Sequence, residues 1–219
     1  MLNELSLIRN ELLQVAGRAC FTCSFQAEDI VVLHLLRQVQ PDIPVLFLDT
    51  GYHFPSLLQY RDLLVESWRV NLMNISADLS REQQERRFGA LHVTDPGQCC
   101  RIRKVEPLFG ALQDFAIWFT GLRREQSPTR VHLECVEVTE LPGGHRLRKV
   151  SPLAMWRRNE VWSYLRANGI PHAPLYDEGY ESIGCAPCTT PPTDPGNVRS
   201  GRWGGAKLEC GIHLCGEAR

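Results

Sequence analysis

Hydrophobic positions along the first 120 residues alternate between short continuous runs and longer segments with helical spacing. The apolar runs at residues 19–24 and 44–48 predict buried strands, and residues 28–39 and the segment after Pro55 predict helices. Two further apolar runs, at residues 69–75 and 116–120, predict additional strands. Strands that alternate with helices in this way indicate an α/β fold with a mostly parallel sheet and helices on both faces.

The second half of the chain is less regular. Residues 131–138 and 145–150 flank a Leu141-Pro-Gly-Gly144 turn and predict a hairpin, and residues 159–167 predict a helix that stops at Asn168-Gly169. Residues 189–205 are rich in Pro, Gly and polar residues. We therefore divide the chain into an α/β domain, residues 1–188, and a mobile C-terminal arm with a tail, residues 189–219.

Composition narrows the class of protein. Of 219 residues, 43% are hydrophobic and 22% are charged, as in ordinary globular domains, and the net charge of −1 argues against a broad nucleic-acid-binding surface. No apolar run is long enough for a membrane span, and residues 1–15 lack the apolar core of a signal peptide. An odd number of cysteines, nine, disfavours a disulfide framework. We expect a cytoplasmic protein whose cysteines bind metal or do chemistry, without nucleic-acid or membrane partners.

Four of the cysteines form two pairs, Cys99-Cys100 and Cys185-Ala-Pro-Cys188. Adjacent residues point to opposite sides of a strand, so Cys99 and Cys100 can share a site only from a turn or helix end. Two pairs of thiolates from distant segments predict a metal site, and the tandem pair favours one [4Fe–4S] cluster over zinc. Zinc, and cysteines that merely fill the core, remain alternatives.

Polar loops follow the first two predicted strands. Ser24, Phe25 and Gln26 open the loop that leads into the first buried helix, and Asp49, Thr50 and Gly51 follow the second strand. Ligands of open α/β sheets bind beyond the carboxyl ends of the strands, and helix N-termini favour phosphate. The two loops predict a nucleotide pocket, although a helix cap and a plain turn would explain each loop taken alone.

Cationic residues gather near these predicted sites. They are Lys104, Arg123, Arg124, Arg199 and Arg202. Paired guanidiniums suit phosphate and sulfate because their planar forks bind oxyanions through two hydrogen bonds. Ordinary solvation of a surface is the alternative explanation.

Cys210 stands apart from the paired cysteines and is the candidate nucleophile. A thiolate needs access and positive neighbours. His213 lies three residues later and would approach Cys210 in a turn, whereas the carboxylate of Glu209 would oppose thiolate formation. The positive neighbours must therefore come from another part of the chain.

Together these segments resemble the adenylyl-sulfate and phosphoadenylyl-sulfate reductases of assimilatory sulfate reduction. The resemblance runs from Ser24 to Leu214 and is carried by Ser24-Phe-Gln-Ala-Glu-Asp29, Leu48-Asp-Thr-Gly-Tyr-His-Phe54, Cys99-Cys-Arg-Ile-Arg-Lys104, Gly121-Leu-Arg-Arg-Glu-Gln-Ser127, Arg199-Ser-Gly-Arg-Trp203 and Glu209-Cys-Gly-Ile-His213. The paired cysteines resemble those of the iron–sulfur branch, which acts on adenosine 5′-phosphosulfate (APS). The branch without a cluster acts on the 3′-phosphorylated nucleotide (PAPS).

The resemblance implies an adenine-nucleotide α-hydrolase-like fold and a reaction. Cys210 would attack the sulfur of APS, AMP would leave, and reduced thioredoxin would release sulfite from the S-sulfocysteine. Lys104, Arg199 and Arg202 would stabilise the departing AMP, and the residues from Ser24 to Asp29, with Asp49 and Gly51, would cradle the adenosine and phosphate. The cluster would polarise and organise the site.

Other interpretations stay open. Residues 204–206 after Trp203 are shorter and less aromatic than the resemblance leads us to expect, and Cys215 is an extra thiol that is either a resolving cysteine or incidental. The substrate could be PAPS or both nucleotides. A relative that uses ATP, or an iron–sulfur sensor in which Cys210 is inert, would share many of these features. The sequence leaves the oligomeric state open, a homo-oligomer included.

Overall fold

The computed structural model describes residues 2–194, 196–205, 207 and 209–213, and Cys215 lies outside this part of the chain. The strands are β1 (Ala19–Thr22), β2 (Val45–Asp49), β3 (Leu72–Ser76), β4 (Ile117–Phe119), β5 (Val136–Glu140) and β6 (Arg146–Val150). The α-helices are α1 (Leu2–Gln14), α2 (Ala27–Arg37), α3 (Pro55–Trp68), α4 (Arg81–Phe88), α5 (Leu91–Thr94), α6 (Pro96–Cys100), α7 (Glu106–Leu112) and α8 (Arg158–Ala167). A π-helical turn, η1 (Arg101–Val105), joins α6 to α7, and short 3₁₀ turns are η2 (Arg124–Gln126), η3 (Pro128–Arg130), η4 (Pro174–Tyr176), η5 (Ala186–Cys188) and η6 (Trp203–Gly205).

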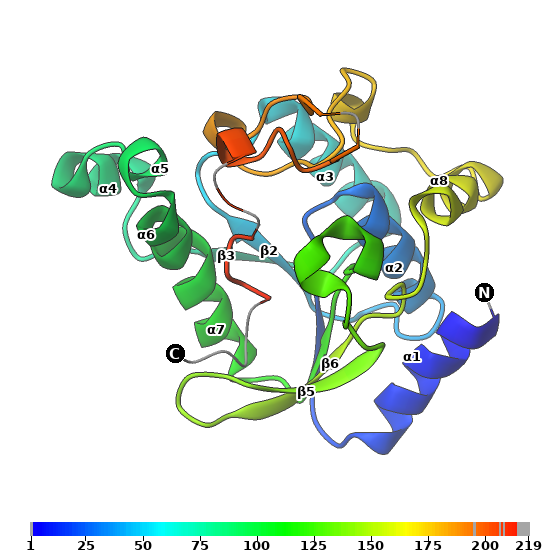
Figure 1. The fold of residues 1–219 in the computed structure, drawn as a ribbon. Helices are drawn as coiled ribbons and strands as arrows, with labels where there is room; N and C mark the ends of the chain where they lie inside the picture. The colour runs from blue at the N-terminus through cyan, green and yellow to red at the C-terminus, as the bar shows by residue number, and fades with distance from the viewer. Residues whose placement is uncertain (1, 195, 206, 208, 214–219) are drawn as a thin grey trace.

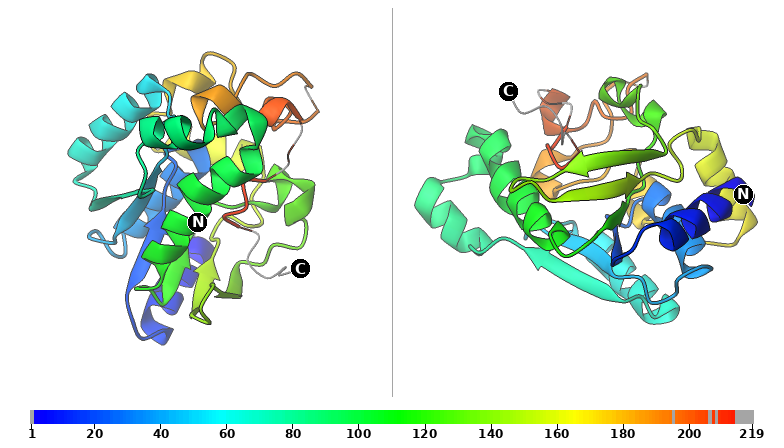
Figure 2. Two further views of the ribbon diagram at one scale, coloured as in Figure 1. Left: turned by 90° about the vertical axis from the view of Figure 1, so that its left-hand side faces the viewer. Right: turned by 90° about the horizontal axis from the view of Figure 1, so that it is seen from below.

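One six-stranded sheet organises the molecule, with the strand order β3-β2-β1-β4-β6-β5. All neighbouring strands run parallel except β5, which pairs antiparallel with β6. In Figure 1, α4, α5, α6 and α7 lie on one side of the sheet and α1, α2 and α8 on the other, and the views in Figure 2 agree. The sequence prediction of a mostly parallel sheet with helices on both faces is confirmed.

Each central strand contributes side chains to two apolar cores, because successive side chains point to opposite faces of the sheet. Phe21, Phe47 and Phe119 belong to the larger core under α1, α2, α3 and α8. Cys20 and Trp118, which alternate with them, belong to a smaller core that includes residues of α7. This burial on both faces explains why the central strands are continuous apolar runs rather than alternating ones.

The predicted strands and helices are present with bounds shifted by a few residues, and β5 differs most. The strand expected at residues 131–138 starts at Val136, because η3 and the turn that follows occupy the preceding residues. After Cys100 the chain forms the π-helical turn η1 and becomes α-helical at Glu106.

The described part of the arm returns to the domain rather than leaving it. An isolated antiparallel bridge between Thr189 and Arg202 folds the arm back on itself, and Glu209 pairs with Arg130 of the domain. We call residues 207–213 the tail, of which residue 208 is not described. In Figure 1 the tail, in red, runs between α7 and the segment that contains η2 and η3, in green. Within the described ranges, no helix combines the length and the apolar character that a membrane crossing requires.

Candidate active site

A cleft opens where the direction of strand addition reverses. From β1 the sheet continues to β2 and β3 on one side and to β4, β6 and β5 on the other. Such switch points are the usual ligand sites of open α/β sheets. The cleft has walls from the loops after β1, β2 and β4, from the arm and from the tail.

The loop after β1 is closed by Asp29. The backbone N–H and the hydroxyl of Ser24 both donate to Asp29 Oδ2, at 2.6 and 2.5 Å, and Gln26 Nε2 donates to Ser24 Oγ at 3.0 Å. Burial raises the pKa of Asp29 to about 6, although the Ser24 hydrogen bonds oppose the shift. Gly121, after β4, sits so close that a Cβ there would lie 2.1 Å from Asp29 Oδ1. Only glycine therefore allows these two loops to meet.

The loop after β2 is fixed by a buried arginine. Arg103, in η1, donates from Nε to the carbonyl of Thr50 and from Nη1 to Gln84 Oε1 at 3.2 Å. His53 Nε2 lies 2.9 Å from the Leu48 carbonyl and braces the same turn. The π-helical turn thus connects the Cys99-Cys100 segment to the cleft wall.

The four paired cysteines converge on one region. Cys99 and Cys185 share a buried apolar cluster, and Cys188 packs against it. Cys99 and Cys100 stand at the end of the short helix α6, as their spacing predicted. Burial, together with the charge of Cys185, raises the pKa of Cys100 and raises that of Cys188 to about 11. The charge of Cys185 affects the pKa of each of the other three thiols, so the two pairs lie in one region of the structure.

The donor set is compatible with an iron–sulfur cluster. Among the described residues, no three His, Cys, Asp or Glu side chains converge tightly enough to hold one metal ion. Four sulfurs around one zinc lie about 3.8 Å apart, because Zn–S bonds are about 2.3 Å. A [4Fe–4S] cluster bonds each thiolate to a different iron and suits wider spacing. Hydrogen-bonding groups also reach the sulfurs: Gln84 Nε2 donates to Cys99 Sγ at 3.7 Å, and Thr50 Oγ1 lies 3.4 Å from Cys185 Sγ.

Lys104 is one of the cations near the cysteines. Burial alone would lower its pKa, but the thiolates of Cys185, Cys210 and Cys100 outweigh burial and raise the pKa above its usual value. Conversely, burial would raise the pKa of Cys185, and Lys104, the Thr50 hydroxyl and Arg202 together lower it. Lys104 therefore stays charged between the paired cysteines and Cys210.

The predicted arginines take different places. Arg123 lines the cleft but is buried, and its Nη2 donates to Glu28 Oε1 at 2.7 Å. Arg124 points away from the cleft: it binds the Leu133 carbonyl and pairs with Glu134. Arg199 and Arg202 both line the cleft from the arm.

Arg202 packs closely against the segment that leads to the second cysteine pair. A Cβ on Gly184 would lie 2.0 Å from Arg202 Nη2, so glycine is needed at position 184 for this guanidinium to lie over the chain. Arg202 is 5% exposed and stacks on Trp203, with its guanidinium carbon 4.5 Å from the ring centre. The arm thereby presents a buried cation to the cleft.

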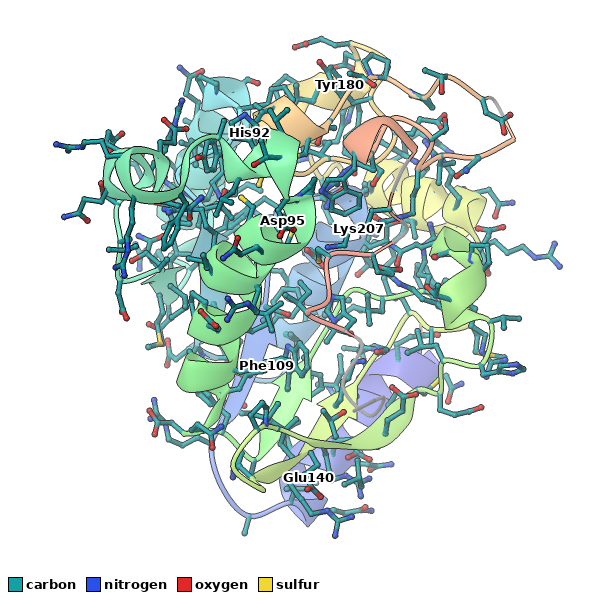
Figure 3. All side chains as sticks on the ribbon, turned by 60° about the vertical axis from the view of Figure 1, so that its left-hand side comes forward. His92, Asp95, Phe109, Glu140, Tyr180 and Lys207 are labelled. Carbon is teal, nitrogen blue, oxygen red and sulfur yellow. The ribbon has the colours of Figure 1, made fainter. Side chains whose placement is uncertain are left out.

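Cys210 lines the same cleft as the strand-end loops. Gly211, next to it, passes beside Val105 of η1, and Figure 3 shows Lys207 on the tail near the region of α6 that follows Asp95. Cys210 is close enough to Cys100 for its charge to affect the pKa of that thiol. Of the paired cysteines, Cys185 lines the cleft together with Cys210, and Cys100 lies near Cys210.

His213 does not act as a charged neighbour of Cys210. Its ring stacks on Trp118, with ring centres 5.5 Å apart and planes inclined by 19°. Burial, assisted by Lys149, Arg130 and Arg199, lowers its pKa well below the usual value, so the imidazole is neutral. Its place in the structure anchors the tail to the sheet.

Several residues that the sequence assigned to the substrate do not line the cleft. Phe25 is fully buried and packs against Phe47, because its backbone takes a left-handed conformation with φ +59°. Asp49 accepts from the Gly51 N–H and stabilises the turn, and neither residue lines the cleft. Among the predicted residues, the cleft does collect Ser24, Gln26, Thr50, Lys104, Arg123, Cys185, Arg199, Arg202, Cys210 and His213.

Comparison with known proteins agrees with this geometry. A model of the phosphoadenosine phosphosulfate reductase domain matches residues 18–191. The chain belongs to this family. Within it, the adenosine 5′-phosphosulfate reductase of Geobacillus kaustophilus is 44% identical over 197 residues, which cover 89% of this chain and 83% of the relative.

Solved structures of other proteins share the fold of this member of the phosphoadenosine phosphosulfate reductase family. The phosphoadenylyl-sulfate reductase of Candida auris superposes with a TM-score of 0.75 at 24% identity, covering 86% of this chain and 90% of that one. The FMN adenylyltransferase of Candida glabrata superposes with a TM-score of 0.64 at 18% identity, over 87% of this chain and 62% of that one. The predicted adenine-nucleotide α-hydrolase-like fold is confirmed.

Proposed function

We propose that the protein reduces adenosine 5′-phosphosulfate to sulfite and AMP through a sulfonated Cys210, with reduced thioredoxin as electron donor. The observation that carries the proposal is the presence of Cys210 in one cleft with the strand-end loops and the arginines of the arm. Relatives at 44% identity that bear the name adenosine 5′-phosphosulfate reductase support the substrate.

In this mechanism the Cys210 thiolate attacks the sulfur of the sulfonyl group. A bond forms between the two sulfurs, and the bond from the sulfonyl sulfur to the phosphate oxygen breaks with its electron pair on AMP. Lys104, Arg199 and Arg202 stabilise the negative charge that develops on the leaving phosphate. The raised pKa of Lys104 keeps its ammonium group charged when the Cys210 thiolate attacks.

The second half of the reaction uses two electrons from a dithiol. One thioredoxin thiolate attacks Cys210 Sγ, a mixed disulfide forms, and sulfite leaves with the electron pair. The second thioredoxin thiol then attacks the mixed disulfide and restores the Cys210 thiol. The tail must leave the cleft for this step, which is the role of the mobile arm in the proposal.

We infer that Cys99, Cys100, Cys185 and Cys188 hold a [4Fe–4S] cluster. When bound, the cluster polarises the site and joins two distant segments of the chain beside the substrate. Gln84 and Thr50, which contact Cys99 and Cys185, orient these sulfurs through hydrogen bonds. A cytoplasmic location is part of the proposal, since reduced thiols require a reducing compartment.

The acidity of the nucleotide loop favours APS over PAPS. Glu28 and Asp29 sit at the first turn of α2, and Glu181 also lines the cleft. A 3′-phosphate would add negative charge near these carboxylates, although Arg123 partly offsets Glu28 and Arg158, whose Nη1 lies 3.4 Å from Glu181 Oε2, partly offsets Glu181.

A single experiment tests the reaction. Protein purified without oxygen is mixed with APS labelled in the sulfonyl group, in the absence of thioredoxin. We expect label on the peptide that contains Cys210, release of an equal amount of AMP, and loss of both in Cys210→Ser. A wild-type protein that binds APS and forms no covalent adduct would overturn the mechanism. Rates with APS and PAPS, each with thioredoxin, decide the substrate.

A further inference from the structure

The residue before the candidate nucleophile is a buried carboxylate. Glu209 is only 6% exposed, and Arg130 Nη2 donates to its Oε2 at 2.8 Å. Thr129 Oγ1 donates to Glu209 Oε1 at 3.1 Å, and Arg199 Nη2 lies 3.6 Å from Oε2. A buried carboxylate is stable only with such partners, so these contacts hold the tail in the cleft.

Arg130 is itself held by a residue that contacts the nucleotide side of the cleft. Its Nη1 donates to Gln126 Oε1 at 2.5 Å, and the same oxygen accepts from the Arg123 N–H at 3.0 Å. Arg123 in turn pairs with Glu28, in the first turn of α2. A continuous set of polar contacts therefore connects the helix that follows the Ser24 loop to the tail.

We propose that Arg130 is a positioning residue, whose ion pair with Glu209 docks the tail so that Cys210 faces the nucleotide. This inference rests on the proposed function and assigns a role to Arg130 of η3, which the sequence analysis did not single out. Arg130 acts through Glu209 and the backbone of the tail rather than on the reacting atoms. Opening this ion pair lets the tail leave the cleft.

The charges around Glu209 explain why a carboxylate is tolerated beside a nucleophilic thiol. Burial would raise the pKa of Glu209, but Arg130, Arg199 and the Thr129 hydroxyl outweigh burial and keep the pKa below its usual value. The carboxylate therefore remains ionised and is matched by the two guanidiniums. Because Arg130 and Arg199 balance the negative charge of Glu209, this charge docks the tail and opposes the Cys210 thiolate less than an unpaired carboxylate would.

The docked state can be measured by hydrogen–deuterium exchange at the amides of residues 209–213 in the full-length protein. Arg130→Met removes the charge and leaves Glu209 buried, so we expect exchange there to accelerate by about tenfold or more. Arg130→Lys keeps the charge and should restore most of the protection. Glu209→Gln should accelerate exchange at least as much as Arg130→Met, and the double variant no more than Glu209→Gln. The control is Arg146→Met, whose exposed ion pair with Glu140 lies on the β5–β6 hairpin and should leave the tail unchanged.

A second readout separates positioning from a general loss of structure. We expect Arg130→Met to bind AMP as tightly as the wild type. Single-turnover sulfonation of Cys210 by APS should slow by about the same factor by which amide exchange in residues 209–213 accelerates. Unchanged exchange in Arg130→Met, with normal sulfonation, would overturn the positioning role and leave the proposed function intact. A wild-type protein that protects the tail but forms no adduct with APS would instead overturn the proposed function.

Discussion

The close approach of Gly121 to Asp29 gives a sharp prediction. An alanine Cβ at position 121 would lie 2.1 Å from Asp29 Oδ1, and 3.1 Å from both its Cγ and its backbone nitrogen, whereas ordinary contacts begin at 3.4 Å. The carboxylate would have to retreat by about 1.3 Å, and the two hydrogen bonds that it accepts from Ser24 would be lost. Gly121→Ala should therefore disturb the nucleotide loop directly.

The expected cost is substantial for a domain of this size. Overpacking costs about 1–3 kcal/mol, and each lost Ser24 hydrogen bond about 1 kcal/mol more. We expect the free energy of unfolding, measured in urea, to fall by an amount in this range, and AMP binding, measured by calorimetry, to weaken. Adding Asp29→Ala to Gly121→Ala should recover part of the stability, because it removes the group that clashes.

The chain supplies a matched control in Gly110 of α7. A Cβ at position 110 meets no atom within 4 Å, so Gly110→Ala should be neutral or stabilising by up to about 1 kcal/mol through helix propensity. If Gly121→Ala unfolds at the same urea concentration as the wild type and binds AMP equally well, the proposed contact between the two loops is wrong.

Three further predictions follow from burial and charge. Arg123→Met should lower the free energy of unfolding by about 3–5 kcal/mol by leaving Glu28 unpaired, whereas Arg124→Met, whose partner is exposed, should change it by less than about 1 kcal/mol. Because the pKa of Asp29 rises from 3.8 to about 6 on folding, its favourable contribution is complete below pH 3.8 and is lost as pH rises through 6. The stability of Asp29→Asn relative to wild type should therefore increase by about 2 kcal/mol from pH 4 to 7, and a flat difference would contradict this. Cys188→Ser, purified without oxygen, should lose the brown colour and contain fewer than about four irons per chain, and a variant with full iron content would exclude Cys188 as a ligand.

The parts of the site that lie at strand ends could be predicted from the sequence. Continuous apolar runs identify the central strands, and parallel strands bring their carboxyl ends to one edge, so Ser24 and Thr50 had to be neighbours. The adjacency of Cys99 and Cys100 required a helix end, and α6 provides it. In each case a local pattern fixes the geometry without information from distant residues.

The remaining features depend on contacts that no local pattern encodes. Arg123 and Arg124 are adjacent and chemically identical, yet one faces the cleft and the other pairs with Glu134, because the extended backbone at position 123 sends them to opposite sides. Glu209 appeared unfavourable beside Cys210 until the structure supplied Arg130, which lies 79 residues away. Buried polar partners of this kind become visible only when the chain is folded.

The stacking of His213 on Trp118 gives the protein an intrinsic optical reporter. The indole lies at the centre of the sheet and is fully buried, and the imidazole of the tail covers one of its faces. Whenever the tail lifts away, water replaces an aromatic ring at that face, and the emission of this tryptophan should shift to longer wavelength. Stopped-flow fluorescence could then time each departure of the tail during turnover without any attached dye.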